Sequence, residues 1–340
     1  MPRISAYSLS QEPDDVMGTY LNFMERAGVH ELIMFFDGPP SPGLEEMIRA
    51  REDGPMRIRA QALDEAYWRD TLGEEVVELS RKATHCTGRA HELMTGDWLW
   101  VGDPDELAEN PRAMFAALDQ VPAEVEAVSV PPAEAAWGPD ETDAPPFTMS
   151  VFRVTTPRGS WRWQLLKYLI YGRWHVFFDR NMLSHKSGKQ FVRRGVKVDL
   201  IDVHRTRRGG RDINVDLAEA AGLERALHVR HYDAVSYEHW IAKMRRRVRN
   251  GALSQSSRRP GRLAQVEMSR DLLARMEAAP DEAEARRIGE RTFRKLYHLT
   301  PFQMWLLRLI GGVTRLEPGL EVAPQPKGEP ICPASPPSRS

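Results

Sequence analysis

Two aspartates, Asp103 and Asp105, stand one residue apart directly after the apolar run Trp98–Val101. In extended backbone the side chains of residues i and i+2 leave on the same side, so both carboxylates can reach one ligand. Hard divalent cations such as Mg²⁺ and Mn²⁺ prefer oxygen ligands, and a bound cation can neutralise charge that builds on a diphosphate. The alternative is an ordinary acidic turn, since Asp and Pro are frequent in turns.

Acidic residues also follow two other apolar runs in the first half of the chain. Glu12 comes after the run 3–10, and Asp37 comes after the run 31–36. In a parallel sheet the carboxyl ends of the strands lie at one edge, which is where ligands bind. We therefore expect Glu12, Asp37 and the aspartate pair to lie at one edge of a sheet and to share a site.

The elements that would position these residues follow from the hydrophobic pattern. Predicted strands occupy residues 3–10, 31–36, 56–60 and 98–101, and predicted helices occupy residues 13–28, a short stretch from Pro42, and 72–94. This alternation predicts an α/β fold with a parallel sheet and crossover helices. The second half is expected to open with further strands, including Val198–His204, and to close in helices at 236–249, 263–278, 281–297 and 300–310.

Charge is distributed unequally along the 340 residues. Residues 1–150 carry 29 acidic and 11 basic side chains, a balance of −18, whereas residues 151–340 carry 19 acidic and 36 basic side chains, a balance of +17. A basic half alone would suggest binding of nucleic acid, but the acidic half opposes a phosphate backbone. We therefore expect no nucleic-acid partner, and salt-dependent binding of DNA or RNA would contradict this expectation.

Three sequence features bear on location. Cys86 and Cys332 are too few for a disulfide scaffold. No basic-then-apolar leader opens the chain. The longest apolar stretches, 164–178 and 302–313, carry charged residues and are shorter than the roughly 20 residues of a spanning helix. We therefore expect a cytoplasmic protein.

Five segments resemble, in order, motifs of bacterial family 2 glycosyltransferases with the GT-A fold. The segment Asp97–Leu107 (DWLWVGDPDEL) is similar to their DWLLFLDxDEFL motif. The other four are the opening 11–38, with QEPD at Gln11–Asp14, Tyr20-Leu21, Gly28-Val29 and Asp37-Gly38, then Asp64–Trp68 (DEAYW), Ser184–Arg193 (SHKSGKQFVR) and His231–Lys243 (HYDAVSYEHWIAK). The last of these is also loosely similar to a motif of family 92 glycosyltransferases. Together the resemblance covers roughly residues 3–250.

The resemblance implies a GT-A-like, Rossmann-like α/β domain over residues 1–235, with a mostly parallel sheet flanked by helices. The helical patterns predict a basic helical C-terminal region over residues 236–316. Residues 131–146 hold five prolines and four acids, so we expect an acidic loop or lid there rather than a packed element. The proline-rich residues 317–340 are expected to form a disordered tail.

For the site, the resemblance implies a transferase that binds a nucleotide-diphospho-sugar. Glu12 and Asp37 would hold the nucleoside, and Asp103 and Asp105 would reach the metal and the diphosphate. His231, in the segment similar to the HYD motif, would complete the ligands of a Mn²⁺ or Mg²⁺ ion. A histidine that only packs or forms hydrogen bonds is the alternative for His231.

Other residues are further candidates. Lys189 and Arg193 would contact the diphosphate, because basic groups at i and i+4 share a helical face and extended backbone would also align them loosely. A solvated basic surface is their alternative. His185 and His204 are rivals to His231 as metal ligand. The acidic loop offers candidates for the base that deprotonates an acceptor, with a merely solvated loop as the alternative: Asp140, Glu141 and Asp143.

Two basic or aromatic segments near the C-terminus suggest contact with a membrane. Residues 243–262 contain eight basic side chains and no acid, which would suit anionic lipid headgroups or a charged glycan. The interpretation we favour is a basic helix followed by a solvated loop. The helix around Trp305 could lie on a membrane surface or pack on the core.

The sequence thus predicts metal-dependent glycosyl transfer, with inversion, from a nucleotide-sugar to a polysaccharide or lipid-linked acceptor. Such an enzyme would work in the cytoplasm or at the inner face of the membrane. The alternative is a nucleotide-sugar-binding or interaction protein on the same scaffold that has lost turnover, suggested by Pro39, Pro40 and Pro104 in the expected site loops. Sugar release from a panel of donors, with and without Mn²⁺, separates the two.

Overall fold

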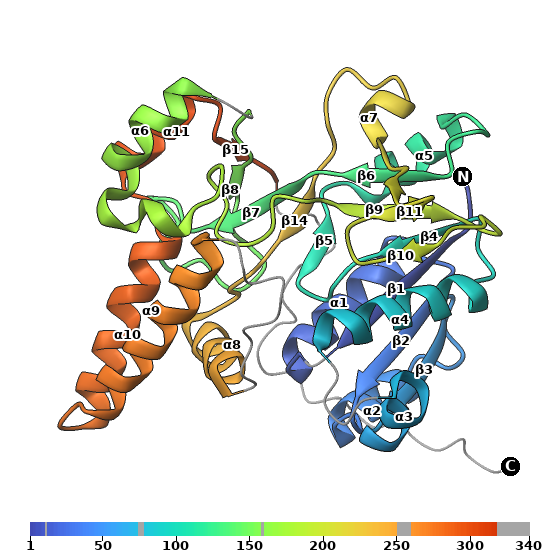
Figure 1. The fold of residues 1–340 in the computed structure, drawn as a ribbon, viewed down its shortest axis with the longest axis horizontal. Coiled ribbons are helices and arrows are strands. Elements are labelled where there is room, and N and C mark those ends of the chain that lie inside the picture. Colours follow the sequence, from blue (N-terminus) through green and yellow to red (C-terminus); the bar gives the residue numbers. More distant parts are fainter. Residues whose placement is uncertain (11, 74–77, 158–159, 250–259, 318–340) are drawn as a thin grey trace, which may run out of the picture.

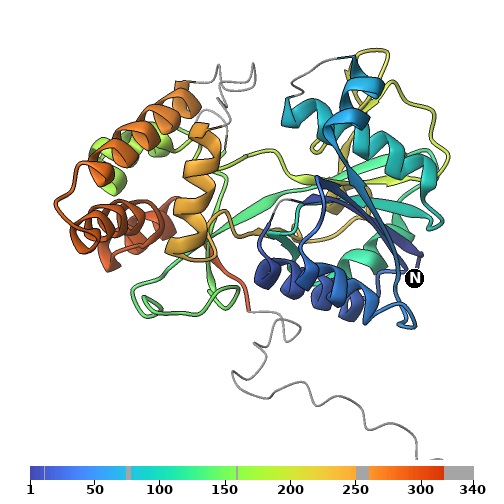
Figure 2. The same ribbon diagram turned by 90° about the horizontal axis from the view of Figure 1, so that it is seen from below.

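The computed structural model describes residues 1–317 except residues 11, 74–77, 158–159 and 250–259. Figures 1 and 2 show two lobes side by side. One lobe is built around a large sheet and contains the N-terminus, and the other is mostly helical. A second, extended sheet runs from one lobe to the other (Figure 1).

Seven strands form the main sheet, in the order β13-β6-β9-β4-β1-β2-β3. Four of them pair in parallel: β1 (Ile4–Ser10), β2 (Glu31–Asp37), β3 (Arg57–Leu63) and β4 (Trp98–Val101). The others are β6 (Ala127–Val130), β9 (Lys189–Arg193) and β13 (Val215–Asp216). Strand β9 runs antiparallel to both of its neighbours, β4 and β6, whereas β13 is parallel to β6. The predicted mostly parallel sheet is confirmed.

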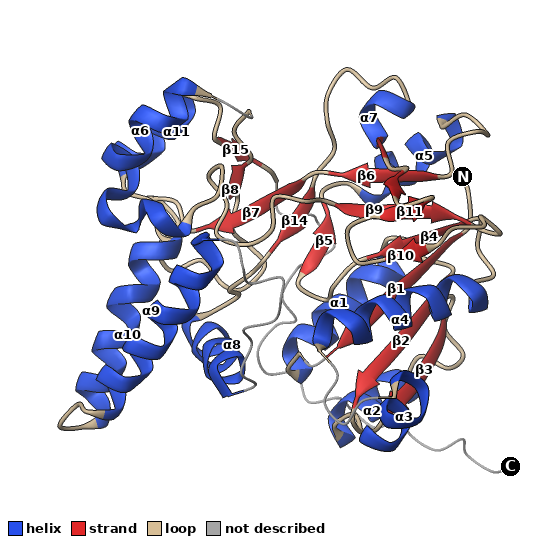
Figure 3. Cartoon of the chain, in the orientation of Figure 1, coloured by secondary structure: helices blue, strands red, loops and turns tan. Residues whose placement is uncertain are grey.

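Helices cover both faces of this sheet (Figure 3). Successive side chains of a strand point to opposite faces, so Trp98 and Trp100 of β4 enter one core while Leu99 and Val101 enter the other. The first core is shared with α1 (Asp14–Arg26), α2 (Pro42–Arg49), α5 (Pro111–Gln120) and α7 (Leu217–Ala220), and the second with α3 (Glu65–Leu72) and α4 (Leu79–Leu93). Burial on both faces explains the unbroken apolar runs.

The second sheet has the order β15-β8-β7-β14-β5. Its strands are β5 (Glu106–Ala108), β7 (Pro132–Ala136), β8 (Val151–Val154), β14 (Val229–His231) and β15 (Val313–Arg315). A small third sheet consists of β10 (Leu200–Ile201), β11 (Thr206–Arg208) and β12 (Arg211–Asp212). Strands β5 and β14 pair antiparallel at the end of the second sheet that meets the main lobe (Figure 1).

The helical lobe is made by two separate parts of the chain. The predicted C-terminal helices are present as α8 (Tyr237–Arg249), α9 (Pro260–Glu277), α10 (Glu282–Tyr297) and α11 (Pro301–Leu309). Two earlier elements, α6 (Trp161–Tyr171) and the 3₁₀ helix η1 (Gly172–Phe177), pack on α11 and α9 respectively. Residues before the predicted boundary at 235 therefore contribute to this lobe.

Two predicted elements differ from the structure because of turn chemistry. The single helix predicted over 72–94 is interrupted, since α3 ends at Gly73 in the left-handed conformation and α4 begins at Leu79. The strand predicted over 198–204 is reduced to β10. Its extension is stopped at Asp202, whose side chain accepts hydrogen bonds from the backbone N–H groups of His204 and Arg205.

The acidic loop predicted over 131–146 is wrong in its first part. Residues Pro132–Ala136 form the fully buried strand β7, which pairs with β8 and β14. The predicted tail lies outside the described residues except for Glu317. In the part of the chain that the structure describes, no helix has the length and apolar character needed to cross a membrane.

Candidate functional site

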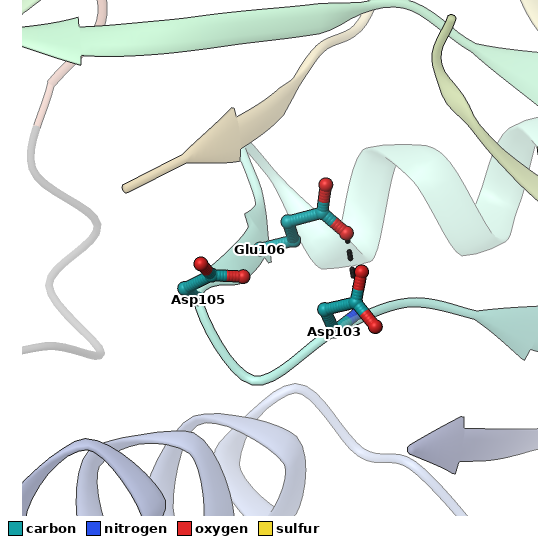
Figure 4. A group of neighbouring side chains, drawn as sticks. All are labelled: Asp103, Asp105 and Glu106. Atoms are coloured by element: carbon teal, nitrogen blue, oxygen red, sulfur yellow. Dashed lines mark hydrogen bonds between the residues drawn. The ribbon is translucent and has the colours of Figure 1, made fainter. Parts of the chain in front are cut away.

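Three carboxylates surround the turn that joins β4 to β5 (Figure 4). One oxygen from each of Asp103, Asp105 and Glu106 lies within 4.8 Å of the others. The turn is closed by two hydrogen bonds, from the Asp103 N–H to Glu106 Oε2 (3.1 Å) and from the Glu106 N–H to the Asp103 carbonyl oxygen (3.0 Å). Asp105 and Glu106 are buried, whereas Asp103 is partly exposed, so solvent reaches this acidic cluster at Asp103.

Strand β14 brings His231 to the acidic cluster. Its antiparallel pairing with β5 places His231 opposite Glu106. The His231 Nε2 atom lies 3.8 Å from Asp105 Oδ2 and 4.0 Å from Glu106 Oε1. The structure therefore brings together the three residues predicted as metal ligands, Asp103, Asp105 and His231, and it adds Glu106, which the sequence reasoning missed.

A buried network orients the imidazole of His231. Its Nδ1 atom is hydrogen-bonded to Ser184 Oγ at 2.9 Å, which leaves Nε2 facing the carboxylates. The backbone N–H groups of Leu183 and Ser184 donate to the carboxylate of Glu134 at 3.0 and 2.8 Å. Glu134 is paired in turn with Arg153 at 3.4 Å, and both side chains are fully buried. The sequence pattern does not reveal this network, because it predicts a loop at Glu134.

Two lysines contact the acidic cluster from different elements. Lys189, the first residue of β9, binds Asp103 Oδ2 at 2.6 Å and Glu106 Oε2 at 2.8 Å. Lys243 of α8 binds Asp105 Oδ2 at 2.9 Å and Asp233 Oδ1 at 3.2 Å. The contact of Lys189 with a diphosphate stays a prediction, and the contact of Lys243 with Asp105 was not predicted, since the basic segment suggests a solvated helix or a contact with lipid or glycan.

Burial and charge set the protonation of this cluster. Burial acts to lower the pKa of Lys189, but the adjacent carboxylates of Asp103 and Glu106 outweigh it and hold that pKa above its ordinary value. Lys189 is therefore charged at neutral pH. Burial raises the pKa of Glu106. The charges of Asp103 and Asp105 raise it further, and the charges of Lys189 and His231 act to lower it without outweighing burial. The pKa of Lys189 is thus set by neighbouring charge, whereas the pKa of Glu106 is set first by burial.

Glu12 lies at the same edge of the main sheet, after β1, and is held by α8. Its carboxylate contacts His239 Nε2 at 2.6 Å and the Arg246 guanidinium at 3.4 Å. Burial would raise the pKa of Glu12, but the hydrogen bond from His239 and the charges of Lys243 and Arg246 outweigh it and lower that pKa. Positions 239, 243 and 246 lie on one face of a helix, so α8 covers the strand ends.

Asp37 ends β2, one strand further from β4 than β1. Its Oδ1 atom accepts hydrogen bonds from Trp68 Nε1 (2.9 Å) and Lys82 Nζ (2.6 Å). The parallel pairing of β1, β2 and β4 confirms that Glu12, Asp37 and the aspartate pair lie at one edge of the sheet. The nucleoside-binding role of Glu12 and Asp37 stays a prediction.

Lys189 and Arg193 lie at opposite ends of β9. Arg193 pairs with Trp98 at the start of β4, and its guanidinium lies 4.2 Å from the centre of the Trp98 ring. It also donates to the carbonyl oxygens of Val121 and Val125 at 2.7 and 2.8 Å. Because this segment is a strand and not a helix, residues i and i+4 are about 13 Å apart. The structure does not bring Arg193 to the acidic cluster.

The rival histidines pack on each other, with the rings of His185 and His204 centred 4.7 Å apart. Burial and the charge of Lys189 lower the pKa of His204 to about 4, so this ring is neutral at neutral pH. Its Nδ1 atom is hydrogen-bonded to the Gly188 carbonyl oxygen at 3.1 Å, which occupies one of its two ring nitrogens.

The acids proposed as catalytic base face other partners. Glu141 accepts a hydrogen bond from the Ser150 N–H at 3.1 Å, Asp140 lies 3.6 Å from the Arg315 guanidinium, and Asp143 is exposed. Among the described residues, no hydrogen bond or ion pair joins these three acids to the acidic cluster. The structure does not bring them to the site.

The donor set fits a divalent cation. Asp103, Asp105 and Glu106 offer hard oxygen ligands, and His231 adds an imidazole nitrogen, a combination that suits Mn²⁺ or Mg²⁺. With Asp233 included, four carboxylates against the two ammonium groups of Lys189 and Lys243 leave a formal charge of −2. A divalent cation would neutralise that charge.

His231→Ala is expected to lower Mn²⁺ affinity about 100-fold or more, because the cluster loses its nitrogen donor and even an outer partner of a ligand is worth 10- to 100-fold. Thermal stability without metal should change little. Mn²⁺ titration monitored by electron paramagnetic resonance measures the affinity, and His185→Ala is the matched control. Loss of Mn²⁺ affinity in His185→Ala, with normal affinity in His231→Ala, would show that His185 and not His231 is the metal ligand.

Gly102→Ala is expected to destabilise the fold by about 1–3 kcal/mol through overpacking. A Cβ at Gly102 would lie 2.1 Å from Trp100 Nε1, and the buried Trp100 ring packs edge-on against Phe191 with centres 4.9 Å apart. The free energy of unfolding in urea measures the effect. Gly88→Ala in α4 is the control, because its Cβ would meet open space and should stabilise by up to about 1 kcal/mol. Equal stability of the two variants would refute the steric account.

Comparisons with known proteins give weak structural likenesses. No protein-family model matches the sequence, and no curated protein matches it. The crystal structure of S. aureus TarS residues 1–349 aligns with a TM-score of 0.31 and 10% identity over 86% of this chain and 71% of that chain. A longer S. aureus TarS structure aligns with a TM-score of 0.29 and 10% identity over 86% of this chain and 43% of that one. Likenesses at this level do not establish a function.

Proposed function

We propose that the protein is a metal-dependent glycosyltransferase that moves a sugar from a nucleotide-diphospho-sugar to a glycan or lipid-linked acceptor, with inversion. The observation that carries the proposal is the convergence of Asp103, Asp105 and His231 at the carboxyl edge of a mostly parallel sheet. Ligands bind at this edge in open α/β sheets. The sequence segments that resemble family 2 glycosyltransferases contribute these three residues.

In this proposal Asp103, Asp105 and His231 would hold the cation, and a cation bound there would supply positive charge to the diphosphate as it departs. Lys189 and Lys243 lie against the same carboxylates and offer two further positive charges to phosphate oxygens. Since Lys189 is anchored by two carboxylates, it also keeps Asp103 and Glu106 in place. The lysines and carboxylates are already in position before the donor binds, so their charges need no rearrangement to stabilise it.

Glu12 and Asp37 are proposed to bind the nucleoside, since carboxylates accept hydrogen bonds from ribose hydroxyl groups or base N–H groups. The acceptor hydroxyl attacks the anomeric carbon, loses its proton to a base, and displaces the nucleoside diphosphate in one step, which inverts the configuration. We place the acceptor, a polysaccharide or lipid-linked glycan, at the inner face of the cell membrane.

Thermal unfolding in the presence of a nucleotide-sugar panel, with and without Mn²⁺, tests the proposal. A ligand that binds only the folded state raises the midpoint of unfolding. We expect at least one nucleotide-sugar to raise the midpoint only when Mn²⁺ is present, and the same donor to release nucleoside diphosphate when incubated with acceptor. Absence of stabilisation by every donor, with and without the cation, would refute the proposal.

One observation favours a second candidate function, a nucleotide-sugar-binding protein without turnover. Each aspartate of the pair already has a lysine partner, so part of its charge is compensated without a cation. Such a protein would bind a donor equally with and without Mn²⁺ and would release no nucleoside diphosphate. The same panel therefore separates the two functions.

A further inference from the structure

Seven large apolar side chains are exposed on two neighbouring helices of the helical lobe. Each has more than half of its surface exposed. In α6 they are Trp161, Leu165, Tyr168 and Leu169, and in α11 they are Phe302, Trp305 and Leu309. The spacings in both helices are those of one helical face, so each helix presents an apolar stripe to solvent. Contiguous exposed apolar surface marks an interaction site.

The core does not need these stripes, because each helix is anchored by a different apolar face. Trp163, Ile170 and Tyr171 of α6 are buried, as are Met304 and Leu307 of α11. The two helices are held side by side, and a hydrogen bond from the Gln303 side chain to the Ile170 carbonyl oxygen (2.6 Å) joins them. The two stripes thus lie on neighbouring helices, and we call them together the α6/α11 surface.

The charged side chains of α6, η1 and α11 themselves have one sign. Residues 161–178 and 300–316 contain no acidic residue. Arg162, Lys167, Arg173 and Arg308 are the basic residues of the two helices and of η1. The Lys167 ammonium lies 5.2 Å from the centre of the Tyr168 ring, which shows that cations and aromatic rings are interleaved on this surface. Aromatic and basic side chains in this mixture are typical of protein segments at the headgroup level of a membrane.

We propose that the α6/α11 surface docks on an anionic membrane, with its aromatic and leucine side chains in the interface and its basic side chains on lipid phosphates. Helix α6 has 11 residues and is about 16 Å long, which is too short to cross a bilayer, so it would lie in the plane of the interface. Because the basic side chains complement anionic lipid headgroups, we infer a lipid surface rather than a neutral apolar partner.

Docking in this orientation leaves the site accessible. Figures 1 and 2 show α6 and α11 at the end of the helical lobe that is remote from the main sheet. Lys243 of α8, in the helical lobe, contacts Asp105 at the carboxyl edge of the main sheet, so the site lies where the two lobes meet and away from the docked surface. The inference goes beyond the proposed function and does not need a donor or a cation.

Co-sedimentation of the full chain with vesicles tests the proposal. Vesicles of phosphatidylcholine with phosphatidylglycerol are compared with vesicles of phosphatidylcholine alone. We expect binding to the anionic vesicles to exceed binding to the neutral ones at least about tenfold, and to weaken as salt is raised. The double variant Arg162→Gln, Lys167→Gln should lose about fivefold in affinity for each charge removed.

The apolar stripe is tested by the double variant Trp305→Ser, Leu309→Ser, which should lose at least about tenfold in vesicle affinity. Both side chains are exposed, so the midpoint of thermal unfolding should be unchanged. The matched control is Leu79→Ser, an exposed leucine of α4 in the other lobe, which should bind vesicles normally.

Three results would overturn the proposal. Equal binding to neutral and anionic vesicles would show that the basic side chains do not contribute to docking. Absence of binding to either kind of vesicle would rule out docking on a membrane. A concentration-dependent dimer, abolished by the Trp305→Ser, Leu309→Ser variant and unaffected by vesicles, would assign the α6/α11 surface to a second copy of the chain. None of these results depends on whether a nucleotide-sugar binds.

Discussion

Asp105→Asn is expected to abolish Mn²⁺-dependent binding of the donor while the protein stays folded. Asp105 is buried between Lys243 (2.9 Å) and His231 (3.8 Å), and an amide of the same shape can still accept the hydrogen bond from Lys243. The amide oxygen carries no negative charge and therefore binds a divalent cation more weakly than the carboxylate does. Loss of a residue that only supports a ligand costs 10- to 100-fold in metal affinity, so loss of a ligand should cost about 100-fold or more.

Equilibrium binding of a nucleotide-sugar, measured with and without Mn²⁺, checks this expectation. Asp53→Asn is the matched control, because Asp53 is an exposed aspartate outside the acidic cluster and its variant should bind as the wild type does. Retained donor affinity with unchanged Mn²⁺ dependence in Asp105→Asn would rule out the ligand role. A lowered midpoint of thermal unfolding in Asp105→Asn would show that Asp105 stabilises the fold instead.

Glu134→Ala is expected to lower the free energy of unfolding by about 3–5 kcal/mol, because it leaves a charge buried without a partner. Glu134 and Arg153 are both 0% exposed and lie 3.4 Å apart. The substitution also removes the acceptor of the Leu183 and Ser184 N–H groups. Since Ser184 orients His231, Mn²⁺ affinity should fall as well.

A double-mutant cycle in urea separates the ion pair from simple loss of volume. Glu134→Ala with Arg153→Met removes both charges, so the double variant should be more stable than Glu134→Ala alone. Glu141→Ala, an acid of the following loop that is bonded to Ser150, is the control and should cost about 1 kcal/mol. A cost below about 1 kcal/mol for Glu134→Ala would show that the buried pair does not support the site.

Patterns within single segments predicted the main sheet and its acidic edge. An apolar run that ends at a polar residue indicates both a strand and where it ends. Local sequence alone therefore predicted that Asp37 and Asp103 lie at or just after the carboxyl ends of β2 and β4. The four C-terminal helices were likewise predicted, because their turns, caps and apolar stripes are local signals.

The supporting residues of the site could not be predicted because they depend on tertiary pairing. Lys243 lies on a segment dense in basic residues, and only the packing of α8 across the strand ends selects it from its neighbours. Glu134 reaches the site because β14 pairs with β7 as well as with β5. Arg193 was misplaced since the i and i+4 rule applies to helices, whereas this segment is a strand.

The most direct test of the central claim is the anomalous scattering of manganese in a crystal grown with Mn²⁺ and a nucleoside diphosphate. We predict one strong peak about 2.0–2.4 Å from a carboxylate oxygen of Asp103, a carboxylate oxygen of Asp105 and His231 Nε2, with the diphosphate bound to the same ion. A peak at another place, or no peak while Lys189 and Lys243 keep their present contacts with the aspartates, would contradict it.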